Sequence, residues 1–436
     1  MIPIFSKRFF PVIVYCLGLN SYSWVAFSQQ AIAAPQSPII LAMPPGFQPT
    51  APKPEPTKPD PLDLSQYQPD PILPSQVPFT PLQRRRLIER LDQLNAEAQA
   101  QADAGNDDIA FVMWYRELRA RRSLGTLEEI NALGRVGGIA WEKSRSEDFN
   151  IINRRLAAIN QEQQALGSLT PEILTAFAQA YQKMRNIDES IKIYQQIRTT
   201  ARQQNNAKVE ERASKALGEL YLARFDYPNA AETYELLLQQ AQAKGNTYNE
   251  GIYLQKLAEI YSKASLPENA VRIKEALVNR YFQDKKIESI PDVKIAIADD
   301  YLTLKQPEKA SQNYQEAFTL SWSLQQYGPA SIALKKLANL YQTHNQPNYA
   351  LQIYQKLLKV EQQSYNYYGL MKAYESIGKI YQDAKQYQPA LVAYQQALTL
   401  ARSLKYQDGE NYFLSQIQLI NNERQGNNPS LTPNNK

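Results

Sequence analysis

The chain has 436 residues, which is enough for two or three ordinary domains or for one extended array. Its formal net charge of +5, from 48 basic and 43 acidic residues, is too close to balance to indicate a nucleic-acid-binding protein. Cysteine and histidine occur once each, which argues against a disulfide framework and against a metal site built from these residues.

The N-terminus has the pattern of an export signal. Lys7 and Arg8 precede the apolar stretch 9–19, and the small residues around Ile32 are typical of a signal peptidase site. An uncleaved membrane anchor is the alternative, but a clean run of about 18 apolar residues is missing. We therefore expect residues 1–33 to be a signal peptide, with no other membrane attachment. The rest of the chain would be exported to the periplasm or cell envelope, or to the thylakoid lumen if the source is photosynthetic.

Residues 34–81 are rich in proline, since 15 of the chain's 27 prolines lie between positions 35 and 81. Such a segment has too few apolar residues for a core and favours extended polyproline II structure. It is predicted to be a disordered linker. Its role would be that of a spacer or, alternatively, of a docking site for a proline-binding module.

A regular pattern of tyrosines and small residues begins at Pro171 and repeats every forty residues. One tyrosine per copy gives the register: Tyr181, Tyr221, Tyr261, Tyr301, Tyr341 and Tyr381. Nine residues after each stands a small residue, and four further on stands Tyr194, Tyr234, Lys274, Tyr314, Tyr354 or Tyr394. Each copy also has two stretches with apolar residues at three- and four-residue spacing, separated by a turn that contains proline in five of the six copies. The pattern predicts six helical hairpins between residues 171 and 408 that bury their apolar faces against one another.

The order Leu/Ile-Gly/Ala-x-x-Tyr, then Ala, then Tyr resembles the tetratricopeptide repeat. The forty-residue period is longer than that of the familiar repeat and is similar to the repeats of kinesin light chain and of Leu-Gly-Asn adaptors. The resemblance implies an all-α fold, an α-solenoid of antiparallel helical hairpins in a right-handed superhelix. It also implies that the first helix of each hairpin lines a concave groove that binds a peptide or a protein.

The same register extends upstream into residues 82–170, which are predicted to form two degenerate hairpins, for about eight in all. Trp141 stands forty residues before Tyr181, with Gly138 three residues before it. Thr126 and Glu129 have the spacing of a capping box at the start of a helix over 127–143.

Two further features mark where helices begin and where the array ends. Thr170 followed by Pro171 is typical of a helix N-terminus. Residues 409–420 are predicted to be a helix that covers the end of the stack, and the polar tail 421–436 is predicted to be disordered.

The sequence gives little support for catalysis. His344 falls in a turn and has no cysteine or histidine partner, so a metal site is not predicted. The glycines of 133–138 lack the spacing of a phosphate loop and fit close-packing positions of a helix instead. No residue pattern groups a nucleophile with a base. We expect no enzyme activity, cofactor or metal.

Candidate binding residues follow from the resemblance, because the ninth repeat position of this family often faces the ligand. In this chain that position holds Gln179, Glu219, Glu259, Asp299, Asn339 and Lys379. Glu219, Glu259 and Asp299 would form an acidic stripe, with lysines on the same helices. The predicted partner-binding residues are Lys215, Glu219, Glu259, Asp299, Lys335 and Asn339. The alternative is that these positions are ordinary solvated surface.

A second candidate surface is a group of arginines on one predicted helix. Arg116, Arg119 and Arg122 share a face, which could attract an anionic partner or could be a solvated face with ion pairs.

The sequence therefore predicts a non-enzymatic scaffold that binds a protein or peptide, and no nucleic acid, for the assembly or anchoring of envelope proteins. The alternatives are a self-assembling structural protein and a glycan-recognising enzyme subunit.

Overall fold

The computed structural model describes residues 60–74 and 78–426. The predicted signal peptide 1–33 and the first part of the predicted linker, residues 34–59, lie outside the described residues. So do residues 427–436 of the predicted tail.

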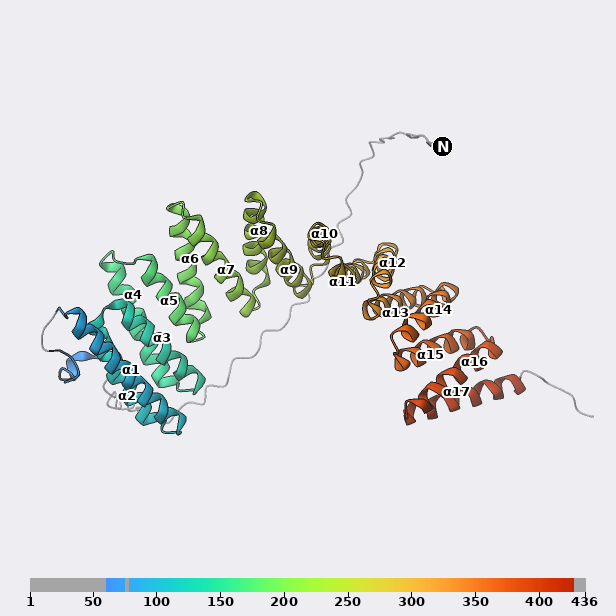
Figure 1. Ribbon diagram of the computed structural model, residues 1–436, viewed down its shortest axis with the longest axis horizontal. Helices are drawn as coiled ribbons and strands as arrows, with labels where there is room; N and C mark the ends of the chain where they lie inside the picture. Colours follow the sequence, from blue (N-terminus) through green and yellow to red (C-terminus); the bar gives the residue numbers. More distant parts are fainter. Residues whose placement is uncertain (1–59, 75–77, 427–436) are drawn as a thin grey trace, which may run out of the picture. The chain divides into compact units, whose positions relative to one another are not determined.

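The described part of the chain forms seventeen α-helices, drawn in chain order in Figure 1, and no strand. Their bounds are α1 Pro81–Asp103, α2 Asp107–Arg121, α3 Thr126–Glu142, α4 Ser146–Ala165, α5 Pro171–Lys183, α6 Ile187–Gln203, α7 Ala207–Ala223, α8 Tyr227–Ala243, α9 Thr247–Lys263, α10 Pro267–Gln283, α11 Ile290–Thr303, α12 Pro307–Ser323, α13 Tyr327–Thr343, α14 Pro347–Gln363, α15 Tyr367–Asp383, α16 Tyr387–Ser403 and α17 Gln407–Gly426. Short 3-10 helices cover Leu64–Gln66 (η1), Arg122–Leu124 (η2) and Ile287–Ser289 (η3).

The helices pack as consecutive pairs. From α5 to α17 each helix packs against the next one along the chain, and α1 with α2 and α3 with α4 form two earlier pairs. The prediction of an all-α solenoid of about eight hairpins is therefore confirmed. A final helix was also expected at 409–420, and α17 is longer at both ends, so residues 421–426 belong to it and not to a disordered tail.

The backbone repeats every twenty residues, which is half the period seen in the side chains. Most helices from α6 to α16 have 17 residues, and the turns between them have three. The middle residue of these turns, and of the turns after α3, α5 and α16, has a positive φ; the non-glycine examples are Ser144, Arg185, Asn205, Phe225, Ser265, Lys285, Lys305, Gln325, Asn345, Tyr365, Lys385 and Lys405. Gly245 takes the same place in the α8–α9 turn.

Each of these turns ends its helix in the same way. After α5, the N–H of Arg185 donates to the carbonyl of Gln182 at 3.0 Å, and the N–H of Asn186 donates to that of Tyr181 at 2.9 Å. This pair of bonds is the Schellman motif, which satisfies carbonyls at the helix end and requires a left-handed residue. The chain leaves each turn in a fixed direction and starts the next helix one residue later.

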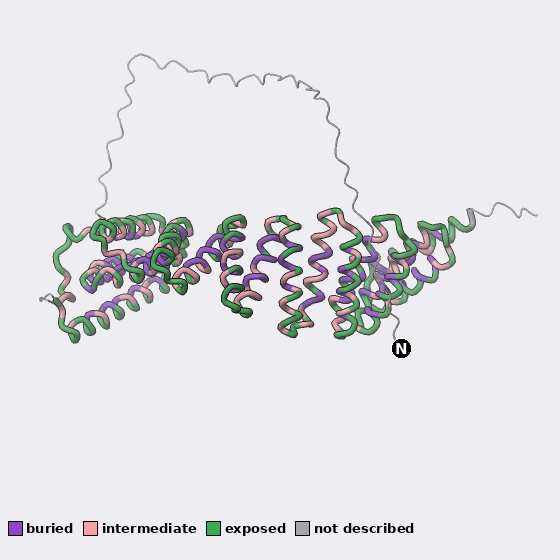
Figure 2. The backbone as a smooth tube through the Cα atoms, turned by 90° about the horizontal axis from the view of Figure 1, so that it is seen from above, coloured by how far each residue is buried: buried purple, intermediate pink, exposed green. Residues whose placement is uncertain are grey.

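The core lies between consecutive helices, as the buried residues in Figure 2 show. The small residue of each second helix has no exposed surface: Ser190, Ala230, Ala270, Ala310, Ala350 and Ala390. Tyrosines of the second helices pack against small residues of the first helices, such as Gly218 and Gly378. A Cβ on Gly218 would lie 2.7 Å from the Tyr234 ring, so a larger residue has no room there.

Tyrosine hydroxyls also join neighbouring hairpins at a constant spacing. Tyr261 donates to Glu235 at 2.9 Å and Tyr301 donates to Glu275 at 3.0 Å, each time across 26 residues. Bonds at the same spacing join Gln195 to Tyr221 and Gln315 to Tyr341. These bonds hold the second helix of one hairpin to the first helix of the next.

The interface between α10 and α11 departs from this pattern. Lys274 stands where the other copies have tyrosine, and its Nζ lies 2.7 Å from Asp300 Oδ2. The side chains of Lys274 and Asp300 are only 9% and 15% exposed, so two charges are buried together. Removing one partner would leave the other unpaired, which typically costs about 3–5 kcal/mol.

Glycines allow the first hairpins to pack closely against the regular ones. Helix α3 lies against α5, and a Cβ on Gly134 would meet Ala180 at 2.6 Å, while one on Gly137 would meet the Met184 side chain at 2.7 Å. The expectation that the glycines of 133–138 are close-packing positions of a helix is confirmed.

Of the two predicted helix starts, one is confirmed and one is wrong. Thr170 accepts a hydrogen bond from the N–H of Ile173, and Pro171 follows it. Helix α3 instead begins at Thr126, with Gly125 as its N-cap and no side-chain cap. Glu129 does not complete a capping box because its carboxylate is bound by Arg122 and Arg155.

The last part of the predicted linker is ordered. Residues 60–73 contain η1 and pack against α2, and Leu62 is only 4% exposed. The prediction of a disordered linker over 34–81 is therefore wrong for the described residues 60–74 and 78–81. None of the described helices is long and apolar enough to cross a membrane.

The zero exposure of Ala310 predicts a strong effect of a larger side chain there. Ala310→Leu should lower the free energy of unfolding by about 1–3 kcal/mol, because the added methyl groups have no space between the helices. Urea unfolding of this variant and of Gln312→Leu, an exposed position on α12, measures the effect. Equal midpoints for the two variants would show that the register is wrong.

The left-handed turn residues predict a change of opposite sign. Lys385 is exposed and has a φ of 56°, a conformation that glycine adopts without steric cost. Lys385→Gly should therefore raise the urea midpoint, by up to about 1 kcal/mol in free energy, less the entropy that glycine adds to the unfolded chain. Lys385→Ala keeps a Cβ and should give no gain. A gain from alanine as large as that from glycine would contradict the assignment.

Candidate functional site

A groove lies between the odd-numbered helices at the N-terminal end of the regular repeats. It has a volume of about 570 Å³. Its walls come from α3, α5 and α7, and α6 supplies Tyr194 and Ile197 beneath them. The remaining lining residues are Leu127, Asn131, Pro171, Glu172, Thr175, Ala176, Gln179, Val209, Arg212, Ala213 and Ala216.

The groove has an apolar base and a polar edge. Ala176, Ile197 and Ala213 are buried, and burial raises the pKa of Tyr194, whose hydroxyl donates to Gln182 at 3.2 Å. Gln179 and Arg212 are exposed, and neither has a hydrogen-bond or ion-pair partner within the described residues. Such a surface offers contacts to apolar side chains below and hydrogen bonds to a backbone or a carboxylate at the edge.

The structure places the predicted acidic stripe on the first helices of three hairpins, but two of its three carboxylates are paired. Glu259 is 2.7 Å from Lys263 on the same helix. Asp299 accepts a hydrogen bond from Tyr314 and lies 2.8 Å from Lys336 Nζ. Glu219 is exposed and, within the described residues, has no such partner.

The contacts of Asp299 change its interpretation. Lys336 belongs to α13 and Asp299 to α11, so this ion pair joins two neighbouring hairpins. Its side chains are 42% exposed, and an ion pair at that exposure contributes little to stability by itself. It does remove Asp299 from an open acidic surface.

The predicted lysines also have partners in the fold. Lys335 Nζ is 2.6 Å from Oε1 of Glu361, a carboxylate with no exposed side-chain surface, and Ser331 donates to the same oxygen at 2.5 Å. Lys215 is 3.0 Å from Glu211 and lies over the ring of Tyr253 at 5.7 Å.

The last of the six predicted residues, Asn339, is exposed and has no partner in the described part of the chain. The assignment of all six to partner binding stays a prediction. Sequence reasoning placed only Gln179 in the α3–α5–α7 groove. It missed Thr175, which lies at the repeat position of the predicted Lys215 and Lys335 but carries no charge, and Arg212, whose position is not shared between copies. It also missed Ile197, because that position is apolar in every copy and indicates a core residue.

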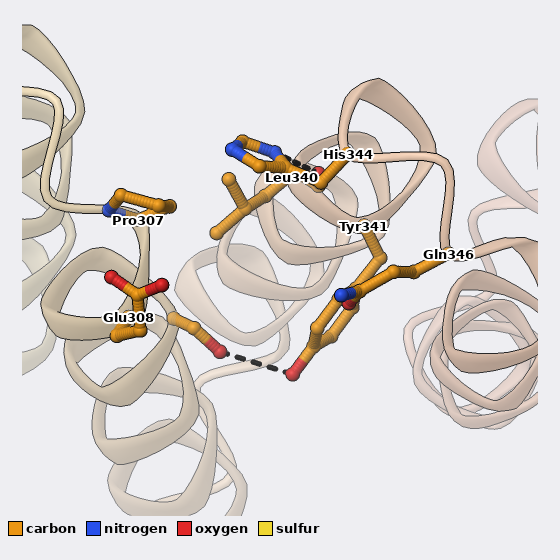
Figure 3. A pocket seen from close by; sticks show the side chains of 7 residues that line it. Pro307, Glu308, Leu340, Tyr341, His344 and Gln346 are labelled. Atoms are coloured by element: carbon orange, nitrogen blue, oxygen red, sulfur yellow. Dashed lines mark hydrogen bonds between the residues drawn. The ribbon is translucent and has the colours of Figure 1, made fainter.

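The one histidine lines a smaller pocket, of about 280 Å³, between α12 and α13 (Figure 3). His344 is exposed, and its Nδ1 donates to the carbonyl of Leu340 at 2.9 Å. The hydroxyls of Ser311 and Tyr341 are 3.0 Å apart in the same pocket. The described residues contain no group of three or more acidic, histidine or cysteine side chains placed to hold a metal ion.

A comparison with protein-family models identifies the repeat. The tetratricopeptide repeat model matches residues 372–404, which cover most of α15, all of α16 and the turn between them. The same side-chain register runs through the five preceding hairpins. The chain carries tetratricopeptide repeats.

Solved structures with related folds share little sequence with this chain. The C-terminal part of a tetratricopeptide-repeat protein from Cytophaga hutchinsonii is 17% identical, with 61% of this chain and 98% of that chain covered and a TM-score of 0.39. BtubC (BKLC) from P. vanneervenii is 18% identical over 50% of this chain and 92% of that chain, with a TM-score of 0.34. Aspartyl phosphate phosphatase F from Bacillus subtilis is 14% identical over 67% and 78%, with a TM-score of 0.36. A search of curated protein sequences gave no significant match.

The ion pairs around Glu211 predict a pH dependence. The pKa of Glu211 lies below 4.5. The hydrogen bond from Lys215 is the largest cause, and together with the hydrogen bond from Lys244 it outweighs burial, which acts in the opposite direction. The contribution of the charged Glu211 to the free energy of unfolding is therefore complete above about pH 4.5. It is lost as the pH falls through the lower pKa that Glu211 has in the folded protein. The difference in urea midpoint between native chain and Glu211→Gln should be largest near pH 7 and should vanish at low pH.

The matched control is Glu232→Gln, which alters an exposed carboxylate of α8 that has no ion-pair partner within the described residues. It should change the midpoint little at any pH. A difference for Glu211→Gln that does not depend on pH would contradict the assigned ion pairs.

Proposed function

We propose that this chain is a protein-binding scaffold, and that the α3–α5–α7 groove binds an extended peptide segment of a partner protein. The observation that carries the proposal is the groove itself, with buried apolar residues at its base and unpaired Gln179 and Arg212 at its edge. A peptide bound there would bury apolar side chains over Ile197 and Ala213. Arg212 would pair with a carboxylate of the peptide.

The proposal extends to where the protein acts. The basic and apolar pattern of residues 1–33 supports export, and the proline-rich stretch after it would hold the repeats away from the membrane or wall. In the periplasm or cell envelope, the scaffold would assemble or anchor other envelope proteins. Its repeats supply binding surface and no catalytic group.

The experiment is affinity capture from an envelope extract with the exported form, residues 34–436, and with three single variants. Arg212→Glu reverses the charge at the groove edge, and the amount of partner that it captures should fall at least tenfold. Glu259→Lys tests the predicted stripe and should also weaken capture, while leaving the melting temperature unchanged because the Glu259–Lys263 pair is exposed. Arg185→Glu, in the α5–α6 turn, is the matched control and should capture like the native chain.

Weaker capture by both Arg212→Glu and Glu259→Lys is the expected result, and it would mean that the partner contacts both the groove and the stripe. Three other outcomes separate the surfaces. Loss with Arg212→Glu alone assigns binding to the groove and removes the stripe from consideration. Loss with Glu259→Lys alone assigns binding to the stripe and contradicts the groove. Equal capture by all four proteins means that neither surface on the odd helices binds the partner.

A further inference from the structure

Residues 60–73 lie across the face of α2 and the start of η2 that carries Arg116, Arg119 and Arg122. Arg116 binds the Asp70 carboxylate through two nitrogens, at 2.5 and 2.9 Å. Arg119 donates to the carbonyl of Pro61 at 2.5 Å and places its guanidinium 3.8 Å from the centre of the Tyr67 ring. The next arginine in the row, Arg122, donates to the carbonyl of Leu62 at 3.0 Å. We name these three side chains the α2 arginine surface.

The arginines contact chemical groups that many extended peptides offer. Two of these groups are backbone carbonyls, one is a tyrosine ring, and one is a carboxylate three residues after the tyrosine. A guanidinium binds a carboxylate with two parallel hydrogen bonds and stacks on an aromatic face, and a lysine does neither as well. The α2 arginine surface is therefore suited to a short pattern, Tyr-x-x-Asp in an extended segment, which Tyr67 and Asp70 supply here.

Few residues of the 60–73 segment are buried. Of its described residues only Leu62 is buried, and Tyr67 is 39% exposed although it lies on an arginine. The side chains of Arg116 and Asp70 are 47% and 19% exposed, so water reaches their ion pair from the Arg116 side. The segment also leaves a cavity of about 630 Å³ against α2, lined in part by Tyr67, Arg116 and Arg119.

We propose that the α2 arginine surface is a second binding site, for an extended Tyr-x-x-Asp segment of a partner protein, and that residues 60–73 occupy it until such a segment displaces them. The site lies on α2 and the 60–73 segment, and it shares no lining residue with the α3–α5–α7 groove. Because residues 60–73 are tethered beside the site, their effective concentration there is on the order of millimolar. A free peptide binds only if its concentration or its affinity is high enough to compete with the tethered segment. A partner with several such segments, or one also bound elsewhere on the repeats, would meet this condition.

The test uses the full-length protein and a synthetic, fluorescently labelled peptide with the sequence of residues 60–74. In the native protein the tethered copy should block the site. The double variant Tyr67→Ala/Asp70→Ala removes the two side chains that the arginines recognise, so it should bind the labelled peptide at least tenfold more tightly than the native protein does. Fluorescence anisotropy measures both affinities. Circular dichroism and the urea midpoint should stay near native, because neither residue lies in an α-helix or in the core.

The control adds Arg116→Glu to the double variant, which should abolish the gain. A peptide with Lys in place of Asp70 should fail on the double variant and should recover binding when Arg116→Glu is present. Equal affinity of the native protein and the double variant would overturn the proposal, as would a gain that Arg116→Glu does not remove. If the native protein instead doubles its mass with concentration, and Arg116→Glu prevents this, the displacing segment belongs to a second copy and the proposal of a foreign partner is wrong.

Discussion

The left-handed residue that closes nearly every helix is the constraint on which the rest of the structure depends. It ends the helix with two hydrogen bonds and aims the chain into the next one, and it recurs every twenty residues from Arg185 to Lys405. Because most helices between these turns have the same length, the small residues and tyrosines of neighbouring helices lie at the same level along the helix axes and contact each other. The core is then built from one contact, repeated between neighbours, and the odd-numbered helices come to lie side by side around the groove.

The side-chain pattern made the hairpins predictable, since Tyr181 and its five counterparts at forty-residue intervals mark equivalent helices. The twenty-residue backbone period was not predictable in this way. Its turn positions hold Arg185, Phe225 and Lys305 among others, and these share no side-chain property; only Gly245, Asn205 and Asn345 are residue types that favour a left-handed conformation. Similarly, the composition of residues 60–73 predicts a linker. Their order comes from Leu62, Tyr67 and Asp70, whose partners on α2 are more than forty residues away.

The charged residues of the odd helices serve the stacking of hairpins as well as any ligand. Asp299 is tied to Lys336, and Lys335 to the buried Glu361, in each case across a helix interface. Sequence position alone could not distinguish these from free surface charges, because each partner lies on another helix and the residue types at these repeat positions differ from copy to copy. The unpaired groups, Gln179, Arg212, Glu219 and Asn339, are therefore the better candidates for binding.

The central claim is that a fixed twenty-residue register, repeated between neighbouring helices, holds the array together. The most direct measurement is urea unfolding of two internal deletions. Deleting residues 327–366 removes α13, α14 and both following turns and joins Gln326 to Tyr367, which keeps the register. Deleting residues 330–366 joins the chain three residues out of register. The account predicts that the first protein keeps native helical content per residue and loses only part of its stability, and that the second loses much more. Equal stability of the two proteins would contradict the claim.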